Sequence, residues 1–232
     1  MICSKEVLNF YKLAENYALG NSDNLLTVKA SYLDNINKDE KEADTFVNEL
    51  PTVREKLKED LAFFLDSDPA IDSAEEVILA YPGFKAIRYY RIANILYRLK
   101  QFLIARIIAE EAHYMTGVDI HPGATIATPF FIDHGTGIVI GETTIIGKRV
   151  KMYQSVTLGA LSLSKGHELH GVKRHPTIGD DVTLYAGVSI LGGDVTIGNR
   201  VTIGSNVFLT ESIPDDMLVT IGKPELVLQK RK

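Results

Sequence analysis

The chain of 232 residues has no tryptophan and only one cysteine, Cys3. A single cysteine cannot form an internal disulfide, so we expect the protein to work in a reducing compartment, the cytoplasm. The sequence has no run of 18 apolar residues, and its N-terminus lacks a signal-peptide pattern, so we expect no membrane association. The formal net charge of -5 indicates no basic surface, so we expect no nucleic-acid partner.

What the second half of the chain does contain is a period of six residues. Aliphatic residues or Met recur at this spacing, with one long gap and one shift by a residue, at Ile140, Ile146, Met152, Leu158, Ile178, Leu184, Ile190, Ile197, Ile203 and Leu209. Many are followed directly by Gly, and four positions later by Val. A hexapeptide period predicts a parallel β-helix. We expect three units per turn, the periodic residues inside, and the Gly residues near corners, where Gly tolerates positive φ.

The first half of the chain has a helical pattern, which ends near residue 118. Apolar residues recur every three or four positions from Val53 to Leu65, and Pro51 is expected to begin that helix or to kink a longer one. Asp68-Pro69 is predicted to be an N-cap followed by a first-turn proline, and Asp72 or Ser73 to cap a short helix. Further helices are predicted around Lys5–Leu19, around Asp39–Leu50, after Pro82-Gly83 and from about Phe102 to Met115.

The six-residue spacing fails at two places. The first interruption contains a histidine, and a histidine follows the second. The first interruption is Asp133-His134-Gly135-Thr136-Gly137. The second is a polar excursion of about residues 160–173, which is expected to leave the coil as a surface loop and which ends directly before Arg174-His175. Insertions in solenoids gather on the binding face, so these two places are the candidate site.

Two kinds of chemistry fit histidines placed in this way. Zinc needs three or four converging ligands, which a β-helix can bring together, although the sequence has no CxxC or HExxH motif. Acyl transfer to a hydroxyl needs a base such as His and a carboxylate that orients the imidazole. Asp119 and His134 are candidates for that pair, because their separation is close to one turn of the coil.

Five motifs together give the chain a specific resemblance to a known family. They are Asp68-Pro69-Ala70, Val118-Asp119-Ile120-His121-Pro122, the segment 132–137, the segment 154–159, and Arg174-His175-Pro176. From Asp68 to Pro224 the chain resembles the serine O-acetyltransferases. The resemblance implies an α+β fold in which an N-terminal all-α helical domain of residues 1–117 precedes a left-handed parallel β-helix of residues 118–225 and a short tail of residues 226–232.

The resemblance also implies a reaction, in which the acetyl group of acetyl-CoA passes to L-serine and gives O-acetyl-L-serine and CoA without a metal. The residues implied are a base, His134, its orienting partner, Asp119, two carboxylates for the serine ammonium, Asp68 and Asp133, and two groups for the serine carboxylate, Arg174 and His175. Oppositely charged clamps suit a zwitterionic amino acid and hold its hydroxyl near the base.

Acetyl-CoA is expected along the edge of the β-helix, where close backbone approach favours the small residues Gly159, Ala186, Gly187, Gly204 and Ser205. The family resemblance further implies a homotrimer or a dimer of trimers, with His134 and His175 facing each other across a subunit boundary. Family members that bind O-acetylserine sulfhydrylase use a tail that ends in Ile. Because this chain ends in Lys232, we do not expect that docking.

Three other functions stay open on the sequence. A hexapeptide acyltransferase acting on a sugar or a similar hydroxyl would keep His134 but would not need the charged clamps of Asp68, Asp133 and Arg174. A metal-dependent hydratase of the carbonic-anhydrase type would carry bound zinc. A non-catalytic β-helix scaffold would give no reason for histidines at both interruptions.

Overall fold

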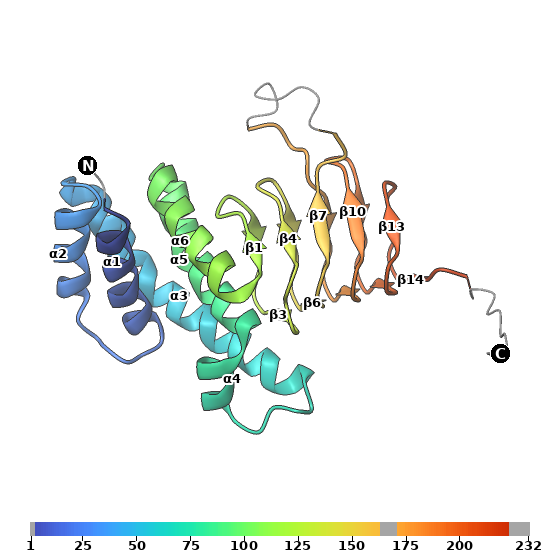
Figure 1. The fold of residues 1–232 in the computed structure, drawn as a ribbon, viewed down its shortest axis with the longest axis horizontal. Coiled ribbons are helices and arrows are strands. Elements are labelled where there is room, and N and C mark those ends of the chain that lie inside the picture. The colour runs from blue at the N-terminus through green and yellow to red at the C-terminus, as the bar shows by residue number, and fades with distance from the viewer. Residues whose placement is uncertain (1–2, 163–170, 223–232) are drawn as a thin grey trace, which may run out of the picture.

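The structure is a computed structural model that describes residues 3–162 and 171–222. Helices form one end of the molecule and a stack of short strands forms the other (Figure 1). Within the described residues six helices precede the strands: α1 (Ser4–Ala18), α2 (Leu25–Asn35), α3 (Glu40–Ser67), α4 (Ala74–Ala80), α5 (Pro82–Arg98) and α6 (Phe102–Thr116). None of these helices is long and apolar enough to cross a membrane.

Helix α3 is a single helix of 28 residues that continues through Pro51. The two helices predicted around Asp39–Leu50 and Val53–Leu65 are therefore one, because their buried positions lie on a continuous stripe. The Asp39 side chain caps this helix by accepting hydrogen bonds from the N–H groups of Lys41 and Glu42. Helix α2, which was not predicted, buries only Val28 and Tyr32 and has a correspondingly weak apolar pattern.

The prediction that Asp68 is an N-cap is wrong. Asp68 lies at the C-terminal end of α3, and its Oδ1 accepts a hydrogen bond from the N–H of Ala70 at 2.9 Å across a turn. The next helix begins later, at Ala74, where the Ser73 hydroxyl accepts from the N–H of Glu76 at 3.1 Å. Because Ser73 caps the next helix, the Asp68 side chain is not used as a cap, and its Oδ2 accepts a hydrogen bond from the Tyr81 hydroxyl instead.

The strands form three parallel sheets, each contributing one face of the coil (Figure 1). Face 1 contains β1 (Asp119–Ile120), β4 (Val139–Ile140), β7 (Thr157–Gly159), β10 (Ser189–Leu191) and β13 (Phe208–Leu209). Face 2 contains β2 (Thr125–Ile126), β5 (Ile145–Ile146), β8 (Thr177–Ile178) and β11 (Thr196–Ile197). Face 3 contains β3 (Phe130–Ile132), β6 (Val150–Met152), β9 (Thr183–Leu184), β12 (Thr202–Ile203) and β14 (Leu218–Val219).

The chain visits faces 1, 2 and 3 in turn, so the predicted parallel β-helix with three units per turn is confirmed. The places where the chain passes between faces are called corner 1–2, corner 2–3 and corner 3–1 below. Nine of the ten periodic residues are at most 1% exposed, and Leu209 is partly buried. The left-handed sense of the coil, which the resemblance implies, stays a prediction.

The Gly residues after the periodic residues do not use the positive φ that Gly tolerates. None of Gly141, Gly147, Gly159, Gly179, Gly198 and Gly204 has a positive φ. They are needed for close approach between coils instead: a Cβ on Gly179 would lie only 2.9 Å from the carbonyl carbon of Gly198. At corner 3–1 a positive φ falls on residues such as His134, Ser155 and Asn206.

A buried ion pair joins the helices to the first coil. Arg91 of α5 donates to both carboxylate oxygens of Asp60 in α3, at 2.6 and 2.8 Å, and the N–H of Phe130 donates to the same carboxylate at 2.9 Å. Burial raises the pKa of Asp60, and the Arg91 charge opposes that rise. This joint fixes the end of α3 against β3, directly beside the first interruption of the coil.

The helical part ends at Gly117, a left-handed C-cap with φ 69°, and β1 follows at Asp119. Buried side chains of the helices and the coil form one continuous cluster. The division into separate domains at residues 117 and 118 therefore stays a prediction.

Candidate active site

A cleft of about 580 Å³ lies where the helices meet the turn after β3. Its lining residues come from the end of α3, the connection between α4 and α5, and the first interruption: Asp68, Ala70, Ala80, Tyr81, Pro82, Asp133, His134 and Thr136. Three of the predicted site residues, Asp68, Asp133 and His134, thus line one cleft, although helices α4, α5 and α6 separate the first from the other two along the chain. We call these three residues the base half-site.

His134 is held on a tight turn that exposes its ring. Its φ is 56°, and the next residue, Gly135, has φ 87° and donates its N–H to the carbonyl of Asp133 at 2.6 Å. Gly137 then donates to the carbonyl of Gly117 at 2.8 Å, which ties the turn to the end of α6. The His134 side chain is 68% exposed, and its Nε2 lies 3.7 Å from Asp133 Oδ2. An exposed imidazole on a fixed turn can take a proton from a bound hydroxyl.

The two carboxylates of the base half-site face the same cleft. The Tyr81 hydroxyl donates to Asp68 Oδ2 at 3.1 Å, and burial together with this hydrogen bond raises the pKa of Tyr81 to about 12. Asp133 is 19% exposed. No Lys or Arg is among the residues that line this cleft in the described part of the chain. The arrangement suits a small cation such as an ammonium group.

Asp119, the predicted partner of His134, lies on β1 and pairs with Val139 of the next coil. Its side chain is partly exposed, whereas that of Ile120 points into the coil. Among the residues that the structure describes, no hydrogen bond or ion pair joins Asp119 to His134. Its role as the orienting carboxylate stays a prediction.

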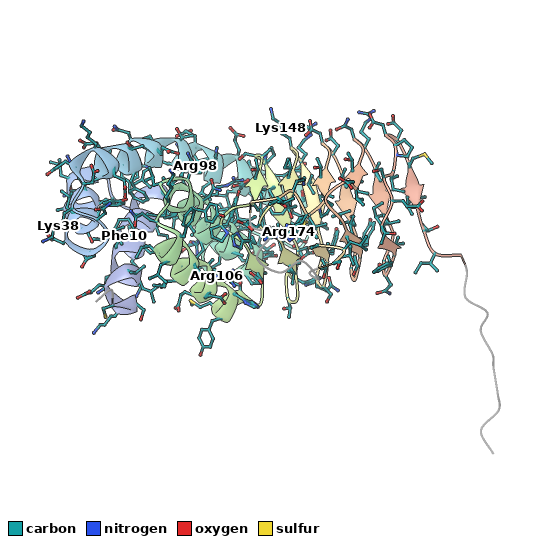
Figure 2. All side chains as sticks on the ribbon, turned by 90° about the horizontal axis from the view of Figure 1, so that it is seen from above. Phe10, Lys38, Arg98, Arg106, Lys148 and Arg174 are labelled. Atoms are coloured by element: carbon teal, nitrogen blue, oxygen red, sulfur yellow. The ribbon has the colours of Figure 1, made fainter. Side chains whose placement is uncertain are left out.

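Arg174 and His175 lie at corner 1–2, directly before β8, and Arg174 is labelled among the strands in Figure 2. We call these two residues the carboxylate half-site. Arg174 forms an ion pair with Glu142, which follows β4 at the same corner one coil earlier. The backbone N–H groups of Arg174 and His175 both donate to the Thr143 hydroxyl, at 2.9 and 3.1 Å.

The environment of His175 favours the neutral ring. The Thr143 N–H donates to His175 Nδ1 at 3.1 Å, so the proton of the neutral imidazole lies on Nε2. His175 is 7% exposed, and burial, followed by the charge of Arg174, lowers its pKa to about 4. His175 can therefore offer an N–H donor at Nε2, beside the charge of the Arg174 guanidinium.

The two half-sites lie at different corners of the β-helix. The base half-site is at corner 3–1 and the carboxylate half-site is at corner 1–2, so face 1 separates them. Neither Arg174 nor His175 lines the cleft that contains His134. The sequence thus predicts six residues of one site, and a single chain brings three of them together.

Four of the five residues predicted for acetyl-CoA share corner 3–1 with His134. Ala186 and Gly187 follow β9, and Gly204 and Ser205 follow β12. Backbone hydrogen bonds stack these turns, since Gly187 donates to Gln154 at 3.0 Å and Asn206 donates to Ala186 at 2.9 Å. The fifth residue, Gly159, ends β7 and lies at the opposite edge of face 1.

Sequence reasoning missed Tyr81, Glu142 and Thr143. It also missed Tyr97 of α5, whose hydroxyl donates to Glu142 Oε1 at 2.6 Å. Tyr81 stands directly before Pro82-Gly83, and Glu142-Thr143 stands at a coil corner after a periodic residue and its Gly. Only these positions in the sequence could have indicated that the residues lie near the site. Most of the predicted excursion, with His167 and His170, and the residues from 223 onward lie outside the described residues. In the described ranges, no three His, Cys, Asp or Glu residues gather as metal ligands.

Comparison with known proteins places this geometry in a family. Residues 175–211 match the family model described as bacterial transferase hexapeptide (six repeats). A plasmid serine acetyltransferase of Synechococcus elongatus is 50% identical over 172 residues, which cover 73% of this chain and 54% of that relative, so the chain spans about half its length. The serine acetyltransferase of Bacillus subtilis is 45% identical over 177 residues, covering 76% of this chain and 78% of that protein.

The fold is also similar to a solved enzyme structure. Serine acetyltransferase isoform 3 of Entamoeba histolytica, solved in complex with cysteine, superposes with a TM-score of 0.83 at 34% identity. The match covers 96% of this chain and 84% of that one, so it includes both the helices and the coil. The chain belongs to the serine acetyltransferase family.

Proposed function

We propose that this chain transfers the acetyl group of acetyl-CoA to the hydroxyl of L-serine, giving O-acetyl-L-serine and CoA for cysteine biosynthesis. The observation that carries the proposal is the cleft in which the exposed imidazole of His134 lies beside the carboxylates of Asp68 and Asp133. Membership of the family supports the same reaction. The single, exposed Cys3 suits a reducing compartment, and we propose the cytoplasm.

In the proposed mechanism His134 is the general base. Its imidazole takes the proton of the serine hydroxyl while the serine oxygen attacks the thioester carbonyl carbon. The carbon–sulfur bond then breaks, and the CoA sulfur leaves with the proton returned by the imidazolium. Asp119 is proposed to stabilise that imidazolium when the site is complete. The reaction balances without a metal.

The zwitterion of serine explains the remaining residues. Asp68 and Asp133 are proposed to bind the ammonium, while Arg174 and the Nε2–H of His175 bind the carboxylate. Charge-assisted hydrogen bonds at both ends would hold the hydroxyl beside the base in a reactive pose. A sugar acceptor carries no charges that these groups could bind, which favours an amino acid over the alternative hydroxyl substrates.

We propose that the two half-sites combine between copies of the chain in a homotrimer or a dimer of trimers. They flank face 1, so a cyclic arrangement around that face would bring corner 3–1 of one copy to corner 1–2 of the next. Acetyl-CoA would then lie along corner 3–1, beside the small residues Ala186, Gly187, Gly204 and Ser205.

A thiol-release assay with acetyl-CoA and a panel of hydroxyl acceptors tests the proposed function. The panel contains L-serine, D-serine, L-homoserine and simple sugars, with zinc content measured on the purified protein. We expect CoA release with L-serine well above the rate with the other acceptors. Activity with a sugar and none with L-serine would show that the chain belongs to the alternative class of acyltransferase.

A further inference from the structure

Two tyrosines stack along corner 3–1, on the coils next to the base half-site. Tyr153 directly follows β6 and Tyr185 directly follows β9, and their ring centroids are 5.1 Å apart with 18° between the ring planes. In face 3 the last residue of β3 pairs with that of β6, and that of β6 with that of β9. The residue after each strand therefore falls in one column, which begins with Asp133 and continues with Tyr153 and Tyr185.

The Tyr185 ring has a side that its own column leaves open. Tyr153 stacks on one face of the ring. The next position in the column, directly after β12, is Gly204, which carries no side chain. Tyr185 is 42% exposed, although its neighbour Leu184 is fully buried in the coil. The corner thus presents an aromatic surface directly beside small residues.

From this arrangement we propose that Tyr153 and Tyr185 form the wall on which the pantetheine arm of acetyl-CoA packs, with a planar amide of the arm stacked on the open face of Tyr185. The inference rests on the proposed function, because it takes acetyl-CoA along corner 3–1 as the donor. It deepens that function by giving the donor two aromatic contact residues that neither the repeat nor the charged clamps require.

The dimensions of the corner fit this placement. The thioester has to lie beside His134 to react. The residues of α3 and of the connection between α4 and α5 line the cleft on the helical side, so the arm leads away toward the later coils. Successive coils are about 4.8 Å apart, which places the two rings about 5 and 10 Å along the corner from Asp133. The arm contains two amides joined by methylene groups, and aromatic faces bind both by close packing.

The wall is uncharged, although it stands next to two carboxylates. Burial raises the pKa of Tyr153, and so does the neighbouring hydroxyl of Tyr185. The carboxylates of Asp133 and Asp68 raise that pKa further, so the ring lies within range of both charges of the base half-site. Tyr153 therefore keeps its proton at neutral pH. A neutral, largely apolar arm packs on such a surface without taking a charged group out of water.

A purely structural role of the stack is the alternative that the experiment has to separate. Backbone hydrogen bonds hold both residues in the coil, since Tyr153 donates to Leu184 and Tyr185 donates to Ile203, each at 3.0 Å. If the rings only support the coil, removing one lowers thermal stability and leaves CoA binding unchanged. Tyr114→Ala is a control for the loss of an exposed ring, because Tyr114 lies on α6 and is 88% exposed.

Isothermal titration calorimetry with CoA on the assembled protein tests the proposal. We expect Tyr185→Ala to raise the Kd for CoA by about fivefold, as for the loss of one aromatic stacking contact. Tyr185→Phe, which keeps the ring, and Tyr114→Ala should bind CoA like the wild type. The KM for acetyl-CoA should rise with the Kd in Tyr185→Ala, while the KM for L-serine stays within about twofold. A wild-type Kd in Tyr185→Ala, with or without a lower Tm, would overturn the proposal.

A fragment of CoA shows which part of the donor the ring contacts. Adenosine 3′,5′-bisphosphate has the nucleotide part without the pantetheine arm, so it should bind Tyr185→Ala and the wild type alike. Weaker binding of this fragment to the variant would overturn the assignment to the arm. A wild type that binds CoA without acetylating L-serine would overturn only the proposed reaction, since the binding data still decide the role of Tyr185. A wild type that binds no CoA would overturn both.

Discussion

The histidines at the two interruptions of the repeat have opposite surroundings. The His134 side chain is 68% exposed on a tight turn, whereas His175 is 7% exposed and bound through Nδ1 to the backbone of Thr143. Exposure lets His134 exchange protons with a ligand. Burial holds His175 in one neutral tautomer, which suits a fixed donor. The two histidines therefore suit the two different roles that we propose, because His134 is exposed on a turn and His175 is buried at a corner.

The buried state of His175 predicts a pH dependence of stability. Its pKa is lowered to about 4 in the folded protein, against about 6.5 in an unfolded chain, so the unfolded state binds the proton more tightly. Its contribution is fully present above about pH 6.5 and is lost as the pH falls through that value toward 4. Urea unfolding at fixed protein concentration should show a larger loss of stability from pH 7.5 to 5 in the wild type than in His175→Asn. Parallel losses would contradict the buried neutral state.

Gly141 predicts a steric effect on the same ring. A Cβ at Gly141 would overlap the imidazole of His175, so Gly141→Ala must displace either the ring or the coil. We expect a loss of about 1–3 kcal/mol in the free energy of unfolding, and a higher KM for L-serine. Gly222→Ala is the control, because no atom of the described residues lies within 4 Å of a Cβ there. Equal behaviour of the two variants would show that Gly141 is not needed for close packing.

At the scale of elements, the joint between α3, α5 and β3 decides where the base half-site forms. Asp60 and Arg91 are buried between these three elements, and Phe64 of α3 packs on Phe131 of β3 with ring centroids 4.7 Å apart. The end of α3 carries Asp68, and the end of β3 leads into Asp133-His134. A shift of this joint would therefore move one wall of the cleft relative to the other.

Asp60→Ala should be strongly destabilising, because it leaves the Arg91 guanidinium buried without its partner. We expect a loss of about 3–5 kcal/mol in the free energy of unfolding, measured by urea denaturation. Asp66→Ala, an exposed position on the same helix, should change stability by less than about 0.5 kcal/mol. A small effect of Asp60→Ala would show that the joint rests on the apolar contacts alone.

The parts of the fold that follow from local periodicity could be predicted, and those that follow from packing could not. Inward-facing positions such as Ile146 and Ile190 repeat every six residues, so the β-helix and its two interruptions could be predicted from the sequence. Asp68 was wrongly predicted to be a helix N-cap, because capping rules consider only neighbouring residues. Its hydrogen-bond partner Tyr81 is 13 positions away in the sequence. Glu142 was missed for the same reason, since its partner Tyr97 is 45 positions away on a helix.

At the scale of the whole molecule, the helices cover one end of the β-helix (Figure 1). The cleft with Asp68, Asp133 and His134 lies at that junction. The base half-site and the carboxylate half-site are on two corners of the coil, with face 1 between them. One chain thus carries both halves of the clamp that we propose for serine, without joining them. The central claim is that two copies complete the site.

Subunit complementation tests this claim most directly. His134→Ala and Arg174→Ala damage different half-sites, and each homo-oligomer should lose about 10²–10⁴-fold in kcat/KM for L-serine, the range for losing a general base or an essential charge contact. When the two chains are co-assembled in equal amounts, some sites combine an intact base half-site with an intact carboxylate half-site. We expect recovery to about a quarter of the wild-type value, from random pairing of neighbours in a cyclic oligomer.

The control is a mixture of His134→Ala with Asp133→Ala, two changes in the same half-site, which should recover nothing. Formation of mixed oligomers is checked with tags of different mass. Recovery in the first mixture alone is the predicted result. If co-assembled His134→Ala and Arg174→Ala chains stay as inactive as their parents, the site is not shared between copies and the central claim is contradicted.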